Sequence, residues 1–339
     1  MTGTDHPYAW LDERAIRIAS DIALGCVLLV AGAVAILNAP ALSFANPENL
    51  GAGFFPTVVA GLLVAVGIVL LVRGSVFGGG RPARWSLKGL AIIVAAIVAV
   101  CVAAVAVGVH LLLLFGPAEY AALIVAVLVA AIAIACRSRV QALGMALLGL
   151  LLATVGLDVE TGVPRLTMDL EQLLDGVTAP IVWLGLFIVG DGLVCLASPS
   201  LWLATYARIV SGWSAPRIPT IVDIGMRIAA VLAIAGAGYL AFEFEHSTWD
   251  IGTLAFFGAF GVAGKLLAWN RLVLLIAFVW GNALEEGIRQ SMLISRGDPT
   301  VFVARPISTT LLVLAGGILA LAALSSVRRA LARPSAQPS

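Results

Sequence analysis

The sequence predicts an all-α, polytopic integral membrane protein with about ten transmembrane helices and both termini in the cytoplasm. Three observations lead to this prediction. Hydrophobic residues make up 61% of the 339 positions and charged residues only 12%, a composition far outside that of soluble domains. Apolar runs of membrane-spanning length recur along the chain. Between them, lysines and arginines concentrate in alternate segments, as they do in cytoplasmic loops.

Each crossing of a bilayer requires about 20 apolar residues. The candidate spans begin near Ile22, Phe54, Leu90, Tyr120, Gln141, Ala179, Met226, Ile251, Leu272 and Ile307. Polar residues interrupt the ninth of these candidate spans. The sequence therefore leaves open whether this span crosses the whole membrane. Glycine and alanine run through all of the candidate spans and allow helices to approach closely in lipid.

The basic residues predict the orientation. With the N-terminus in the cytoplasm, only Arg165, Arg289, Arg296 and Arg305 of the 20 lysines and arginines lie outside, which satisfies the positive-inside rule. An even number of spans then returns the C-terminus to the cytoplasm. Acidic residues such as Asp5 and Asp12 in the leader favour a retained first span over a cleaved signal peptide.

A polar insert at residues 158–176 separates two pairs of hydrophobic runs and is predicted to lie outside the membrane. Arg165 is its single base, and the acids around it are Asp158, Glu160, Asp169, Glu171 and Asp175. A guanidinium group can hold a carboxylate substrate in bidentate fashion. Arg165 is therefore a candidate substrate contact, with Asp158 and Asp175 as neighbouring candidates. Alternatively, Arg165 pairs with the local acids, and a net-negative loop attracts a polycarboxylate poorly.

Four polar residues of the ninth span fall on one helical stripe: Asn282, Glu285, Glu286 and Arg289 occupy positions i, i+3, i+4 and i+7. Charges at membrane depth often line an ion or solute path, so Glu285 or Glu286 could carry a coupling ion, Na⁺ or H⁺. The competing interpretation is a structural Glu285–Arg289 pair at the outer helix end. Asp191, in the sixth span, is either neutral and hydrogen-bonded within the bundle or exposed at the cytoplasmic surface.

Other function classes find little support. A net charge of +1 offers no electrostatic footprint for nucleic acid. The four cysteines lie singly in apolar runs and the three histidines are scattered, so we expect no disulfide framework, bound metal or other cofactor. The sequence has neither HExxH nor GxSxG, and we therefore expect no enzyme activity.

The N-terminal part contains the motif Gly51-Ala-Gly53-Phe54-Phe55-Pro56, followed by a span that reaches Arg73. In physical terms this is a helix entry, with aromatic residues at the interface and proline in the first turn. The motif and the span layout resemble the small, TctB-type membrane subunit of tripartite tricarboxylate transporters. This resemblance implies a four-helix membrane domain at residues 1–140.

The remainder resembles the large, TctA-type subunit of the same systems. The shared patches are TVGLD, TGVPR and LLDG within residues 154–176, GNALEEGIR from Gly281, and FVARPIS, which contains Arg305-Pro306. Arg305 with Pro306 also has the chemistry of a helix start with an anchoring arginine. The resemblance implies a shortened large-subunit domain of about six helices at residues 141–339.

The chain departs from the large-subunit pattern in one respect. The glycine- and proline-rich motifs of the type GALxPG and LGIPG, expected to break helices at the solute site, are absent from the sequence. The resemblance implies a multi-pass component of the bacterial inner membrane that serves carboxylate uptake. Its implied partners are an intact large TctA-type subunit and a periplasmic solute-binding protein. The alternative is a scaffold or degenerate fusion that transports nothing.

Overall fold

The computed structural model describes residues 13–38, 54–77, 115–134, 138–158, 161–199, 220–245 and 247–331. The longer helices are α1 (Glu13–Asn38), α2 (Phe54–Phe77), α5 (Pro117–Ile134), α6 (Arg139–Ala153), α10 (Thr220–Glu245), α11 (Thr248–Leu266), α12 (Arg271–Ile294) and α14 (Pro306–Leu331). Between α6 and α10 lies one helix in three parts, α7 (Ala179–Trp183), the π-helical η3 (Leu184–Val189) and α8 (Gly190–Ala197). The short α13 (Val301–Ala304) precedes α14.

These helices match the expected elements closely. Every expected span except the one near Leu90 corresponds to a described helix, and α12 runs without a break through its polar stripe. The span near Leu90, the glycines Gly51 and Gly53 of the entry motif and all three histidines lie outside the described residues. Phe54, Phe55 and Pro56 form the first turn of α2, as expected for a helix entry.

Five of the described helices are long and apolar enough to cross a membrane. Their apolar windows are Ser20–Leu37, Phe54–Ser75, Pro117–Ile134, Ala179–Ala197 and Val222–Glu243. The chain is therefore a multi-pass membrane protein. Helix α6 has 15 residues and is about 22 Å long, shorter than the hydrocarbon core. The total of ten spans and the location of the termini remain predictions.

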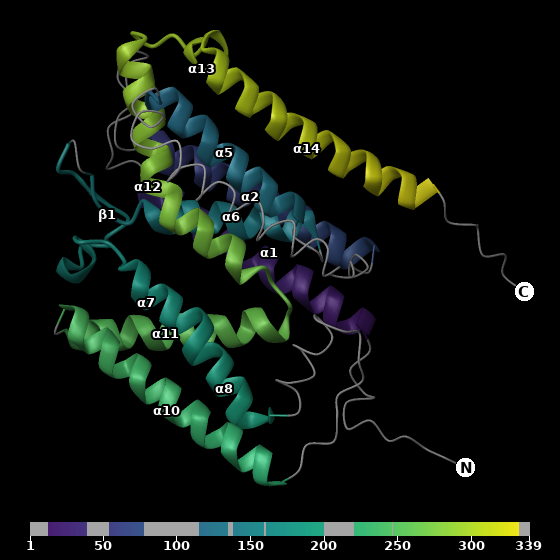
Figure 1. Ribbon diagram of the computed structural model, residues 1–339, viewed down its shortest axis with the longest axis vertical. Coiled ribbons are helices and arrows are strands. Elements are labelled where there is room, and N and C mark those ends of the chain that lie inside the picture. The colour runs from purple at the N-terminus through teal and green to yellow at the C-terminus, as the bar shows by residue number, and fades with distance from the viewer. Residues whose placement is uncertain are drawn as a thin grey trace, which may run out of the picture.

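The described helices pack in two groups (Figure 1). In the larger group, the α1–α2 hairpin packs on α6, α6 packs along α12, and α5 packs against α12 and α14. In the smaller group, α10 and α11 flank the three-part helix α7–η3–α8. The division at residue 140 remains a prediction, and α5, from the expected first domain, packs on helices of the expected second domain.

A close helix contact holds α6 against α12. A Cβ added at Gly149 would collide with the carbonyl oxygen of Leu274 and lie 2.9 Å from the Cβ of Ala277. Glycine is therefore the residue that permits this approach. Around the contact, the fully buried side chains of Met145 and Leu274 belong to one continuous hydrophobic core. The result is a rigid α6–α12 pair that supports the insert.

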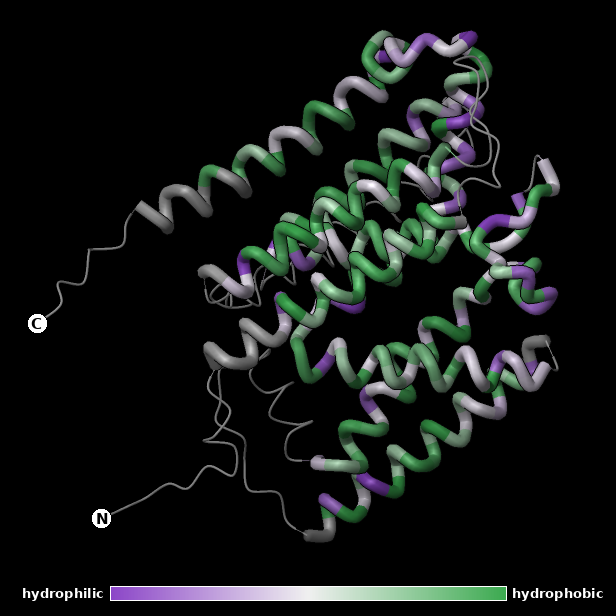
Figure 2. Tube along the Cα trace, turned by 180° about the vertical axis from the view of Figure 1, so that it is seen from behind, coloured by the Kyte–Doolittle hydropathy of each residue, from purple (hydrophilic) through white to green (hydrophobic). Residues whose placement is uncertain are grey.

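The hydropathy pattern agrees with a membrane setting. Hydrophobic residues follow the lengths of the helices, whereas hydrophilic residues gather in the insert and toward helix ends (Figure 2). Large apolar side chains such as Leu232 on α10 and Leu321 on α14 are 67% and 70% exposed. In a membrane protein such side chains face lipid. The insert and the start of α1 lie on opposite sides of the molecule (Figure 1).

Candidate functional site

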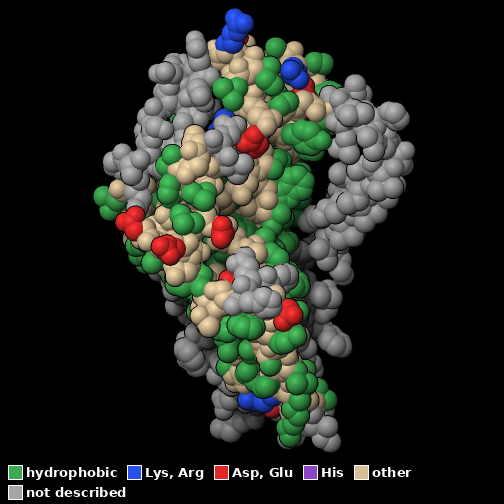
Figure 3. Space-filling view, turned by 90° about the vertical axis from the view of Figure 1, so that its left-hand side faces the viewer, with side chains coloured by type: hydrophobic (Ala, Val, Ile, Leu, Met, Phe, Trp, Pro, Cys, Tyr) green, Lys and Arg blue, Asp and Glu red, His purple; other side chains and the backbone are tan. Residues whose placement is uncertain are grey.

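The insert between α6 and α7 folds as a small hairpin followed by a single helical turn. Strand β1 (Gly156–Leu157) pairs antiparallel with β2 (Pro164–Arg165), so that Gly156 lies opposite Arg165. The short helix η2 (Glu171–Leu173) follows. Gly156 has a φ of 123°, a conformation that glycine adopts without strain. The hairpin thus places Arg165 against the C-terminal half of α12. Acidic side chains gather on this face of the molecule (Figure 3).

Four charged side chains form a closed network between the insert and α12. Arg165 pairs with Asp158 at 2.9 Å and with Glu285 at 2.5 Å. Arg289 pairs with Asp158 at 3.0 Å and with Glu285 at 2.8 Å. All four residues are at most 6% exposed. Two arginines thus meet two carboxylates, and the formal charge of the network is zero.

Asp158 is held in its ionised form. Burial by itself would raise the pKa of this carboxyl, but a hydrogen bond from Thr161 and the guanidinium groups of Arg165 and Arg289 outweigh it, so the pKa lies below the ordinary 3.8. The main-chain N–H of Thr161 donates to the same carboxylate at 3.1 Å. Asp158 therefore stays ionised at neutral pH.

Both structural pairs considered from the sequence are present, with two differences. Glu285 does pair with Arg289, but the pair is buried rather than partly solvated. Arg165 pairs with one acid of the insert, Asp158, and its second partner comes from α12, 120 residues away. Glu286 points elsewhere and accepts a hydrogen bond from Gln290. Any role of these residues toward an ion or solute remains a prediction.

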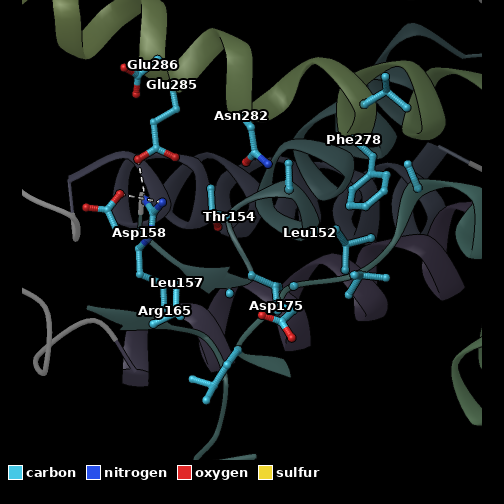
Figure 4. A pocket seen from close by; sticks show the side chains of 18 of the residues that line it. Leu152, Thr154, Leu157, Asp158, Arg165, Asp175, Phe278, Asn282, Glu285 and Glu286 are labelled. Carbon is cyan, nitrogen blue, oxygen red and sulfur yellow. Dashed lines mark hydrogen bonds and ion pairs between the residues drawn. The ribbon is translucent and has the colours of Figure 1, made fainter. Parts of the chain in front are cut away.

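A pocket of about 400 Å³ lies beside the network, between α12 and the insert. Figure 4 shows Asn282 and Glu285 extending from α12 toward the insert, while Asp175 belongs to the opposite wall. The remaining lining includes the apolar residues Leu152, Val155, Leu157, Leu174, Val177, Phe278 and Val279. The pocket therefore brings together every candidate of the polar stripe and all three candidates of the insert.

A second ion-pair cluster lies at the opposite end of α12. Asp191 pairs with Arg271 at 2.9 Å and with Lys265 at 3.2 Å. Arg271 also donates to the carbonyl oxygen of Leu186 at 2.6 Å and lies 5.0 Å from the centre of the Phe187 ring. Leu186 belongs to the π-helical turn, where the i→i−4 pattern is broken and carbonyls become available. Asp191 thus lies within the bundle, as one of the two interpretations expected, but its partners there are the cationic side chains of Arg271 and Lys265.

A third buried polar cluster, which was not expected from the sequence, joins α1, α2 and α6. Asp21 is 1% exposed and pairs with Arg73 at 2.8 Å. Gln141 donates to Asp21 and to Ser20, and Arg73 donates to Ser138. The signal in the sequence was an acid, Asp21, at the start of one apolar run and an arginine, Arg73, at the end of the next.

Arg305, the expected anchor at the start of the last span, also forms an ion pair. Its partner is the buried Glu119, at 3.2 Å.

Part of the chain is similar to known proteins. Residues 85–200 match the family model described as the tripartite tricarboxylate transporter TctA family. The matched stretch contains α5, α6, the whole insert and the three-part helix, but not α12. It also extends across the boundary expected after residue 140. Over this stretch the chain is similar to a family of transporters.

Two relatives come from Agrobacterium vitis. The chain is 35% identical over 103 residues to an uncharacterized protein in the TAR-II ttuC' 3' region, covering 30% of this chain and 42% of that protein. It is 32% identical over 103 residues to an uncharacterized 52.8 kDa protein in the TAR-I ttuC' 3' region, covering 30% of this chain and 20% of that protein. The chain thus aligns with less than half the length of either relative. No solved structure matches the chain.

Proposed function

We propose that this protein is a membrane component of a tripartite tricarboxylate transporter-type uptake system for di- or tricarboxylates. The observation that carries the proposal is the TctA family match over residues 85–200, which includes the insert and 13 of the 19 residues that line the pocket. The multi-pass helical architecture supports it. In this proposal the N-terminal helices act as a TctB-type small subunit, and the protein resides in a bacterial inner membrane.

The proposal includes partners. A periplasmic solute-binding protein would deliver the carboxylate, and an intact large TctA-type subunit would supply the solute site. The second partner is proposed because the sequence lacks the glycine–proline motifs that break helices at such a site. A coupling ion, Na⁺ or H⁺, would drive uptake, with Glu285 and Glu286 as the proposed contacts.

A non-transporting membrane scaffold is the second candidate, and the closed ion-pair networks favour it. The cluster around Asp158 ties the insert to α12 through charges that are already paired. The clusters around Asp191 and Asp21 each tie three helices together. Such networks hold a bundle in one arrangement. A transporter instead needs helices that exchange contacts between its two states.

The test is co-purification followed by uptake. The full-length tagged chain would be isolated from native membranes in mild detergent, and its partners would be identified by mass spectrometry. We expect a TctA-type subunit or a periplasmic solute-binding protein to co-purify. Labelled citrate uptake by cells with and without the chain would then measure its contribution. Isolation of the chain alone in several detergents, together with unchanged uptake in its absence, would favour the scaffold.

A further inference from the structure

The pocket beneath the insert carries an excess of negative charge. Its charged lining residues are Asp158, Arg165, Asp175, Glu285, Glu286 and Arg289. Two arginines therefore face four carboxylates, and the formal charge of the lining is −2. Both guanidinium groups are already shared between Asp158 and Glu285. The remaining charge belongs to Asp175, which is exposed, and Glu286, which is half-buried.

This charge balance selects against a carboxylate ligand. A carboxylate entering the pocket would have to displace Asp158 or Glu285 from an arginine, and this would leave a buried carboxylate without its partner. Breaking a buried ion pair in this way costs several kcal/mol, roughly 3–5. A cation entering the pocket breaks none of these pairs and is attracted by the net negative charge of Asp175 and Glu286, the second of which also accepts a hydrogen bond from Gln290.

The uncharged walls suit an organic cation rather than a bare metal ion. Asn282 and Thr154 supply side-chain oxygens that can accept N–H donors. Phe278 and Val279 supply apolar surface on the α12 side, and Leu152 supplies it on the α6 side. An aromatic ring also attracts a cation to its face. The volume of about 400 Å³ accommodates a cationic head together with a short alkyl stem.

We propose that this pocket binds a guanidinium or alkylammonium group. The site is separate from any carboxylate site that the proposed function requires, although it shares Glu285 and Glu286 with the proposed coupling-ion contacts, and the inference stands on the pocket lining. Two sources supply this chemistry: a free organic cation, or an arginine or lysine side chain of a protein on the insert side. Exposed apolar residues of the insert, Met168 at 56% and Leu170 at 39%, offer additional contact area to a protein.

The test measures stabilisation of the detergent-purified, full-length chain by ethylguanidinium chloride at low millimolar concentrations. Thermal unfolding would be followed by tryptophan fluorescence, because a ligand of the folded state raises the unfolding midpoint in a saturable way. Potassium chloride at equal concentration controls for ionic strength, and citrate serves as the anionic comparison. We expect a saturable rise with ethylguanidinium that neither control reproduces.

Variants assign the effect to the pocket. In the double variant Asp175→Asn/Glu286→Gln, we expect the apparent Kd for ethylguanidinium to rise about tenfold, since two carboxylate partners are removed. Asp169→Asn is the matched control, because Asp169 is an exposed acid of the same insert that does not line the pocket. Its Kd should stay within about twofold. The unliganded midpoint of each variant reports whether folding is intact. Asn282→Leu, which removes the side-chain amide from the pocket without changing its charge, should independently weaken binding.

A further arm separates the two sources. The capped tripeptide acetyl-Leu-Arg-Leu-amide should bind more tightly than ethylguanidinium if a protein side chain is the natural occupant. Met168→Ser should then weaken only the peptide. Equal affinities for the two probes would identify a free cation as the source. The proposal is overturned if ethylguanidinium does not bind, if potassium chloride has the same effect, if citrate stabilises more strongly, or if Asp169→Asn weakens binding as much as the double variant.

Discussion

Arg165 and Glu285 meet because the insert folds back onto α12, and loss of either charge would leave the buried four-residue network with an unbalanced charge. Arg165 is 5% exposed and Glu285 is 6% exposed. A buried ion pair adds little net stability over an apolar pair, but removal of one partner is expensive. The four-residue network therefore acts mainly as a constraint, which holds the insert in a single position over the pocket.

At this scale we expect Arg165→Gln and Glu285→Gln each to lower the free energy of unfolding by about 3–5 kcal/mol, because each leaves a buried charge unbalanced. The double variant should lose less than the sum of the two single losses, with a coupling energy of about 1–3 kcal/mol. Thermal or denaturant unfolding of the purified chain measures all three values.

Glu171→Gln is the matched control for this cycle, since Glu171 is an exposed acid of the same insert. Its effect should remain within about 0.5 kcal/mol. If the loss in the double variant equalled the sum of the two single losses, Arg165 and Glu285 would not interact, because residues that do not share an interaction show no coupling. That result would contradict the ion-pair network.

The α6–α12 pair is the element on which the site is built. α6 leads directly into the insert, and α12 contributes the polar stripe, so their relative position sets the shape of the pocket. The contact at Gly149 places the two backbones against each other. In a bilayer, where apolar side chains gain nothing by leaving lipid, such van der Waals packing of small residues drives helix association.

We expect Gly149→Ala to destabilise the protein by about 1–3 kcal/mol, because the new methyl group has to displace the α12 backbone. Gly236→Ala on α10 is the control: a Cβ at Gly236 would meet nothing within 4 Å. That substitution should be neutral or stabilise the helix by up to about 1 kcal/mol. Thermal unfolding compares the two, and equal effects would show that the α6–α12 contact is not tight.

The molecule as a whole has an insert side and an opposite side. The pocket and the acidic insert mark the first, and the clusters around Asp21 and Asp191 lie toward the second. Arg73 pairs with Asp21, so the end of α2 lies beside the beginning of α1. The distribution of basic residues predicts that this second side is cytoplasmic.

Single-cysteine labelling tests this orientation. In a background without native cysteines, a membrane-impermeant maleimide should label the Gln172→Cys variant in cells whose cytoplasmic membrane is intact. The Ser75→Cys variant should react only after permeabilisation. Both positions are exposed, and neither belongs to an ion-pair network. The reverse pattern would show that the predicted orientation is inverted.

The sequence by itself determined where the helices and the insert lie. Apolar run length, proline and glycine are local properties, so Pro56 and Pro306 each mark the first turn of a described helix. The i, i+4 pair Glu285–Arg289 is local too, because both residues lie on a single helix face. The family resemblance of residues 154–176 could also be recognised at this level, since it depends only on residue order, and the TctA family match contains it.

Only the tertiary structure decided which charges meet. Arg165 meets Glu285, and Asp158 meets Arg289, each across more than a hundred positions of the chain. Asp21 meets Gln141 across a similar separation. Such pairings depend on the order in which helices pack, and in lipid that order is set by shape and small residues rather than by hydropathy. The net charge of the pocket follows from these pairings. For that reason Arg165, a carboxylate contact in one interpretation of the sequence, lines a pocket suited to a cation.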